Sequence, residues 1–236
     1  MDISTVLSEA WGLYRRFLWR FFLTAVTVFA VLDLLSALAD LAAGDSLAAG
    51  IFWSVVAAVI GVAGFFWVQA ALVELVRDVR DGRADRTVGG TYRAVQPRLP
   101  ALIVAGLLAA FGIGIGFLLL IVPGLFLLVI WSMLIPAIVI EGRSAGESFS
   151  RSREIVRGYG WSVFGLIIVT FLLVGFASAV IRLVFAPLPE FLDTWLGSLV
   201  AHSLTIPFAV AVLTTAYFHL TKRESTDTPL LVAPTP

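Results

Sequence analysis

The stretch "ALIVAGLLAAFGIGIGFLLLIVPGLFLLVIWSMLIPAIVI", residues 101–140, runs without a single charged side chain. A helix needs about 20 apolar residues to cross a bilayer, so this stretch is long enough for two crossings. Pro123 and Gly124 stand at its middle. Proline cannot continue a helix there, and glycine permits a tight reversal of the chain. The segment therefore predicts a hairpin of two membrane spans, at residues 102–121 and 125–140.

The rest of the chain has the same character. Of its 236 residues, 60% are hydrophobic and 14% are charged, whereas a soluble domain has about 25% charged residues. The fold class that we predict is all-α, a polytopic membrane bundle of six transmembrane helices. The six predicted spans are residues 17–38, 47–73, 102–121, 125–140, 163–185 and 196–220. Residues 224–236 are rich in Thr and Pro, which predicts a short disordered tail.

Basic residues predict the orientation of these spans. The chain has 16 Lys and Arg residues, and all except Arg182 fall on one side of the predicted bundle. Basic residues favour the cytoplasmic side, so we expect both termini to be cytoplasmic. Residues 36–39, Ser-Ala-Leu-Ala, offer an alternative as a signal-peptide cleavage site. The preceding apolar run is longer than the usual 7–15 residues, and cleavage would not change the orientation of the other spans.

A charged segment, "SAGESFSRSREIVRGYGW" at residues 144–161, separates the fourth and fifth predicted spans. Ser144 and Glu147 have the spacing of a capping box, and Phe149 and Val156 recur at helical spacing. The segment predicts an amphipathic helix on the inner membrane surface, with its arginines toward phosphate headgroups. The candidate lipid headgroup contacts are Arg151, Arg153 and Arg157. The alternative is that these arginines serve only to set the topology.

Similar segments occur twice more. Residues 87–92 align with residues 144–149, and residues 9–11 align with residues 147–149. Each segment precedes a span, so the order predicts three repeats, each a short cytoplasmic amphipathic helix followed by two spans. The repeats would begin near residues 4, 87 and 144. The alternative is that every basic loop of a membrane protein looks amphipathic.

Residues 121–165 resemble the bacterial glycerophosphoryl diester phosphodiesterase membrane domain and related uncharacterised six-helix membrane proteins. The residues that carry the resemblance are Pro123, Gly124, Pro136, Glu141, Ser148, Arg151, Ser152 and Trp161. The resemblance implies a multi-pass protein of the bacterial plasma membrane. It does not imply phosphodiesterase activity, because that activity belongs to a separate soluble barrel for which this chain has no room.

Catalysis is not expected from these residues. The chain has no cysteine, and its two histidines, His202 and His219, lie nearly five helical turns apart. Neither a zinc-protease motif nor a phosphate loop is present, so we predict no enzyme, no catalytic residue, no cofactor and no metal site. The net charge of zero gives no reason to expect nucleic acid as a partner. The expected partners are membrane lipids and an unidentified protein.

Two functions remain open. The first, which we favour, is a non-catalytic accessory, scaffold or lipid-organising protein of the membrane. The second is a small-solute transporter or channel, because ionisable groups inside spans often mark a transport pathway. Asp33 and Arg182 lie at depths that would allow an intramembrane ion pair. The alternative for Asp33 is that its carboxylate reaches the membrane surface.

Overall fold

The computed structural model describes residues 1–43, 47–80, 82, 85–189 and 193–227. All regular secondary structure within these ranges is helical. The helices are α1 (Ile3–Arg16), α2 (Leu18–Ala43), α3 (Leu47–Val79), α4 (Val88–Val95), η1 (Gln96–Arg98), α5 (Leu99–Leu119), α6 (Ile121–Ile130), α7 (Leu134–Glu141), α8 (Ala145–Val156), α9 (Gly160–Phe185), η2 (Asp193–Gly197) and α11 (Ser198–Asp227).

Six helical stretches among the described residues are long and apolar enough to cross a membrane. They are Leu18–Ser36, Leu47–Val79, Val88–Leu119, Ile121–Glu141, Gly160–Phe185 and Trp195–Lys222. The predicted class, an all-α bundle with six membrane spans, is confirmed. Helix α11 continues to Asp227, so residues 224–227 of the predicted tail are helical. Residues 228–236 of that tail lie outside the described residues.

The short helices α1, α4 and α8 begin in the same way. Asp2, Thr87 and Ser144 each stand before the first turn, and each side chain accepts a hydrogen bond from a backbone N–H of that turn. The predicted capping box is present at α8, where the Ser144 N–H also donates to the Glu147 carboxylate over 3.0 Å. Hydrogen bonds from the N–H and the hydroxyl of Ser144 lower the pKa of Glu147. Each short helix precedes a helical hairpin, as the three-repeat interpretation predicts.

An aromatic contact joins each short helix to the interior of a span. The edge-to-face pairs are Trp67–Tyr92, Trp131–Phe149 and Trp11–Phe208, with ring centroids 5.4, 5.1 and 5.9 Å apart. In the first two pairs the span directly precedes the short helix in the sequence. For α1, the span that makes this contact is α11. The three repeats therefore form a closed ring, in which α1 packs on α11.

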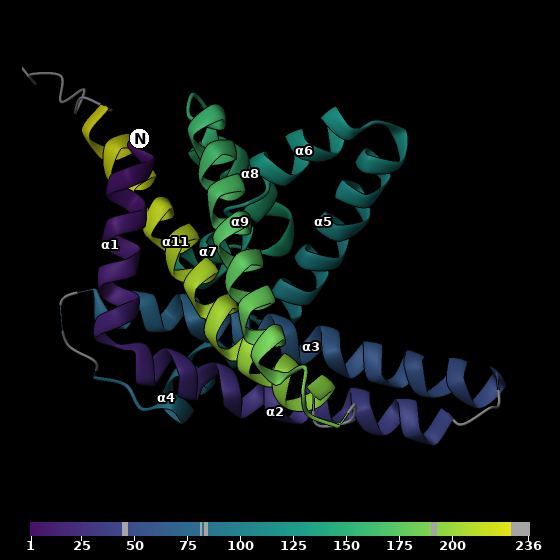
Figure 1. The fold of residues 1–236 in the computed structure, drawn as a ribbon. Helices are drawn as coiled ribbons and strands as arrows, with labels where there is room; N and C mark the ends of the chain where they lie inside the picture. The colour runs from purple at the N-terminus through teal and green to yellow at the C-terminus, as the bar shows by residue number, and fades with distance from the viewer. Residues whose placement is uncertain (44–46, 81, 83–84, 190–192, 228–236) are drawn as a thin grey trace, which may run out of the picture.

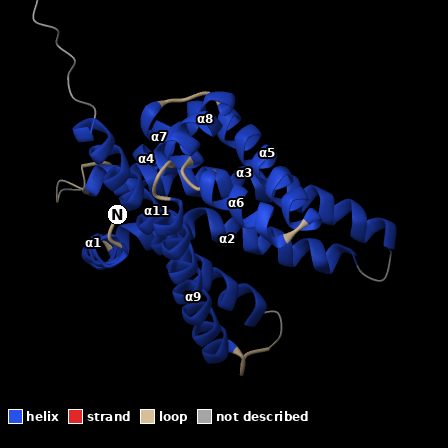
Figure 2. Ribbon diagram, turned by 90° about the horizontal axis from the view of Figure 1, so that it is seen from above, coloured by secondary structure: helices blue, strands red, loops and turns tan. Residues whose placement is uncertain are grey.

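The α2–α3 and α5–α6 hairpins separate toward their tips, whereas α11 of the third hairpin packs on α2 to near its own tip, at Leu199 and His202. In α3 the buried residues lie between Val68 and Val79, and none lies in the half nearer the hairpin tip. In α9 they are Val163, Leu166 and Thr170, all in the first half of the helix. The α2–α3 hairpin extends well away from the other helices in two perpendicular views (Figures 1 and 2). The core is thus at the end of the bundle that carries α1, α4 and α8, which we call the base.

The second hairpin reverses at Leu120, and the predicted reversal at Pro123-Gly124 is wrong by a few residues. Leu120 is extended, with φ −163° and ψ 152°, and α6 begins at the next residue. Pro123 lies in the first turn of α6, where its missing N–H costs no helical hydrogen bond. Gly124 instead permits close packing, because a methyl group on Gly116 of α5 would lie 2.9 Å from its Cα.

This close approach predicts a difference between two glycines of α5. Gly116→Ala should lower the stability of the protein by about 1–3 kcal/mol, because the methyl group meets backbone that must move. Gly114→Ala is the matched control, since nothing lies within 4 Å of a methyl group there. Thermal unfolding in detergent measures both variants. Equal melting temperatures for the two would contradict the close packing of α5 on α6.

Candidate functional site

The fourth span is broken inside the membrane region. Helix α6 ends at Ile130 and α7 begins at Leu134, with a turn between them. The span predicted over residues 125–140 is present as part of Ile121–Glu141, but its helix is interrupted at this turn. A proline clashes with the carbonyl group four residues earlier and cannot donate a hydrogen bond to it. For Pro136 that residue is Ser132, in the middle of the turn, so the position of the break follows from the proline.

Ser152 of α8 bonds to both sides of this break. Its hydroxyl donates to the carbonyl oxygen of Ile130 over 2.7 Å and accepts from the N–H of Met133 over 3.1 Å. Ser152 is fully buried. A backbone group without a partner is costly inside a membrane. The surface helix α8 therefore supplies the hydrogen bonds that the span has lost.

Glu141, the last residue of α7, binds polar groups from α8, α11 and the α7–α8 loop. Its carboxylate accepts hydrogen bonds from Arg151 Nε over 2.9 and 3.0 Å and from Arg143 Nε over 3.0 Å. The hydroxyl of Tyr217, on α11, donates to the same carboxylate over 2.7 Å. Arg151 also pairs with Glu154 over 2.9 Å. These contacts fix α7, α8 and α11 to one another at the base of the bundle.

The three candidate headgroup arginines separate into two kinds. The Arg151 side chain is only 16% exposed and binds Glu141, so the prediction that it faces lipid headgroups is wrong. Glu141 draws it inward, because a paired carboxylate compensates the burial of its charge. Arg153 and Arg157 are exposed on the outer side of α8. Only these two remain candidates for headgroup contact.

Asp33 and Arg182 do not come together in the described part of the chain. The Asp33 carboxylate instead lies 3.3 Å from Nδ1 of His202, across the interface of α2 and α11. The Phe29 ring packs beside this imidazole, with 5.4 Å between ring centroids. Arg182 is exposed near the tip of the third hairpin. The predicted ion pair between Asp33 and Arg182 is therefore wrong, and the partner of Asp33 is His202. The spacing of residues in the sequence does not show which span faces Asp33.

The base has polar contacts at the other two repeat junctions as well. Glu74, at the end of the second span, lies 3.6 Å from Arg86, just before α4. His219, near the end of the last span, lies 2.6 Å from the carboxylate of Glu9 on α1. Each junction therefore joins the end of a span to the short helix or its leading residue by a pair of ionisable groups.

The remaining residues of the predicted motif make packing contacts or local hydrogen bonds, or lie exposed at the start of a helix. Pro136 is buried within α7, and the buried Ser148 hydroxyl donates to the carbonyl oxygen of Ala145 over 2.7 Å. Gly124 lies against Phe117, whose ring would clash with any side chain at that position. Trp161 is 87% exposed at the start of α9. The sequence analysis missed Tyr217 and the role of His202, which local spacing does not reveal.

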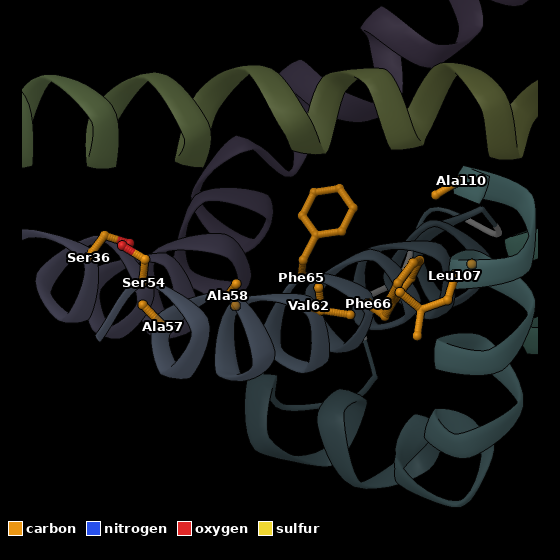
Figure 3. A pocket seen from close by; sticks show the side chains of 11 residues that line it. Ser36, Ser54, Ala57, Ala58, Val62, Phe65, Phe66, Leu107 and Ala110 are labelled. Atoms are coloured by element: carbon orange, nitrogen blue, oxygen red, sulfur yellow. The ribbon is translucent and has the colours of Figure 1, made fainter. Parts of the chain in front are cut away.

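Two apolar clefts lie between neighbouring hairpins, and a third lies between α1 and the third hairpin. The α3–α5 cleft has a volume of about 590 Å³, with Ser36 and Ser54 at one end and Leu107 and Ala110 at the other (Figure 3). The α6–α9 cleft has about 580 Å³, and the α1–α9 cleft, which also includes α11, has about 910 Å³. These sizes fall within the range of small-molecule and cofactor sites. The first two clefts result from the separation of hairpins, and the third lies where α1 meets α9 and α11.

Six apolar helices, joined by polar contacts at one end, define a multi-pass helical membrane protein. The chain belongs to the family described as domain of unknown function DUF7847, which matches residues 44–220. No curated protein and no solved structure matches the chain.

The geometry around Glu141 predicts different roles for two arginines of one helix. Arg151→Gln removes the charge that binds Glu141 and should lower stability by about 2 kcal/mol, less than a fully buried pair would cost. Arg153→Gln removes the same charge from an exposed site, so its melting temperature should match the wild type. Thermal unfolding of both variants in one detergent provides the comparison. A larger loss for Arg153→Gln than for Arg151→Gln would contradict the assignment.

Proposed function

We propose that the protein is a non-catalytic membrane protein that organises lipid, as an accessory or scaffold in its membrane. The observation that carries this proposal is the set of three apolar clefts on the bundle. The base of the bundle is held by polar and aromatic contacts, while the clefts between α3 and α5, between α6 and α9, and beside α1 are open to the bilayer. Lipid chains are the apolar molecules available at such clefts. A protein of this shape can hold lipid between its hairpins while its base stays rigid.

The proposed setting is the bacterial plasma membrane, with the base and both termini on the cytoplasmic side. The support is the distribution of basic residues, which favours that orientation. We also infer a relation to the glycerophosphoryl diester phosphodiesterase membrane domain. Three residues of the shared motif support it: Arg151 binds Glu141, and Ser152 binds the break between α6 and α7.

Lipid retention tests the proposal. The wild-type protein, purified in mild detergent, should keep phospholipid that mass spectrometry detects after extensive washing. Gly61→Phe should reduce this amount at least twofold, because Gly61 lines the α3–α5 cleft and has open space around it. Gly175→Phe is the control, since Gly175 is exposed and also has open space. A wild-type protein that washes free of all phospholipid would overturn the proposal.

Transport of a small solute or ion is the second candidate function. The observation that favours it is the Asp33–His202 pair, a carboxylate and an imidazole within two spans. Ionisable groups inside a membrane are expensive and often functional. The break between α6 and α7 adds to this, because broken spans are common in transporters. However, the hydroxyl of Ser152 satisfies the backbone groups at this break. The break therefore has a structural explanation that does not require a transport pathway.

A flux measurement separates the two functions. Liposomes with the wild-type protein and liposomes with Asp33→Asn should hold a proton gradient equally well if the protein organises lipid. A pH-sensitive dye inside the liposomes reports the gradient, and empty liposomes give the background. A leak that the wild type shows and Asp33→Asn lacks would favour transport.

A further inference from the structure

The three clefts differ in the charges at their mouths. The lining of the α6–α9 cleft contains no charged side chain, and its basal end is formed by Gly158, Tyr159 and Gly160. Arg157 directly precedes this end, and Arg153 lies one helical turn earlier on α8. Both are exposed, and within the described residues neither makes an ion pair. The neighbouring acid, Glu154, is paired with Arg151.

The shape of the α8–α9 corner brings these cations to the cleft. Gly158 has φ +83°, a left-handed conformation that side chains rarely adopt, and it lets the chain turn sharply from α8 into α9. The turn sets the end of α8 at the basal mouth of the cleft. Trp161, exposed on the first turn of α9, lines the same mouth. Tryptophan is enriched at the depth of lipid headgroups.

The interior of the cleft suits an acyl chain. Its walls are formed by side chains of α6, among them Leu125, Phe126 and Val129, and by Phe164 of α9. The α6 and α9 helices touch each other little, so the cleft runs between them open to the bilayer. A molecule with an apolar chain and an anionic head could place its chain against the apolar walls of the cleft and its head beside Arg153 and Arg157.

We propose that the α6–α9 cleft is a binding site for an anionic phospholipid, with its phosphate at Arg153 and Arg157. This inference rests on the proposed lipid-organising function and names the lipid class and the site. A zwitterionic lipid carries its own cation beside the phosphate and gains less from two arginines. The α1–α9 cleft is less suited to an anion, because the carboxylate of Asp2 binds Ser4 in its lining over 2.8 Å.

Lipid competition tests the site. The protein is placed in nanodiscs of phosphatidylglycerol and phosphatidylcholine in equal parts, and native mass spectrometry counts the lipids that stay bound. We expect the wild type to prefer phosphatidylglycerol. The double variant Arg153→Gln/Arg157→Gln should reduce that preference by about fivefold for each charge, or about 25-fold in total. Its melting temperature should match the wild type, since both side chains are exposed.

Two further variants control the experiment. Arg15→Gln/Arg93→Gln removes the same charge from exposed positions on α1 and α4, and should leave the preference unchanged. Val122→Trp adds a bulky side chain at an exposed lining position of the cleft and should lower the amount of retained phosphatidylglycerol. An equal loss of preference in both arginine doubles would overturn the site, and so would full retention by Val122→Trp.

The two proposals fail in different ways. A wild-type protein that retains phospholipid without preference for phosphatidylglycerol overturns the anionic site and leaves the lipid-organising function in place. A wild-type protein that retains no phospholipid of either class overturns both.

Discussion

A backbone carbonyl or amide that loses its helical partner inside a bilayer is costly until another group satisfies it. In this protein the break before Pro136 leaves the carbonyl of Ile130 and the N–H of Met133 without helical partners. The hydroxyl of Ser152 forms a hydrogen bond with each of them. The surface helix α8 must therefore lie under the fourth span with Ser152 inward. Once α8 is in this position, Arg151 faces Glu141, and Tyr217 of α11 completes the contact. One hydrogen-bonded break thus determines how three helices meet.

The molecule divides its stabilising contacts unevenly. Polar pairs gather at the base, where each span end meets a short helix or its leading residue, and edge-to-face aromatic contacts join the short helices to the spans. Away from the base, the α2–α3 and α5–α6 hairpins hold together mainly by contact within each pair of helices, such as Gly116 against Gly124, whereas α11 also packs on α2. Lipid competes well for the apolar faces that remain, because lipid tails are as apolar as the side chains. The clefts between hairpins follow from this division.

Much of the fold could be predicted from local sequence. Apolar length predicts the six spans, and Ser144 with Glu147 predicts where α8 begins, because both signals depend on neighbours in the chain. The contacts that make the site depend on residues far apart. Asp33 and His202 are separated by 169 positions, and Glu141 and Tyr217 by 76. Arg151 and Arg153 look alike in sequence, and only the position of α7 decides which of them is drawn inward. The reversal at Leu120 was missed because Pro123 is compatible with a first helical turn.

The packing of α1 on α11 has a consequence for the order of assembly. Glu9 and His219 are separated by 210 positions, yet they meet at 2.6 Å. Because α1 precedes α11 in the sequence, α1 is synthesised well before its partner, and the ring of repeats stays open until α11 has emerged. Until then the apolar face of α1, including Val6 and Ala10, has no helix to cover it. We expect the amphipathic helix α1 to lie on the membrane surface until α11 is made. The packing of α1 on α11, which closes the ring of repeats, is therefore a late step in folding.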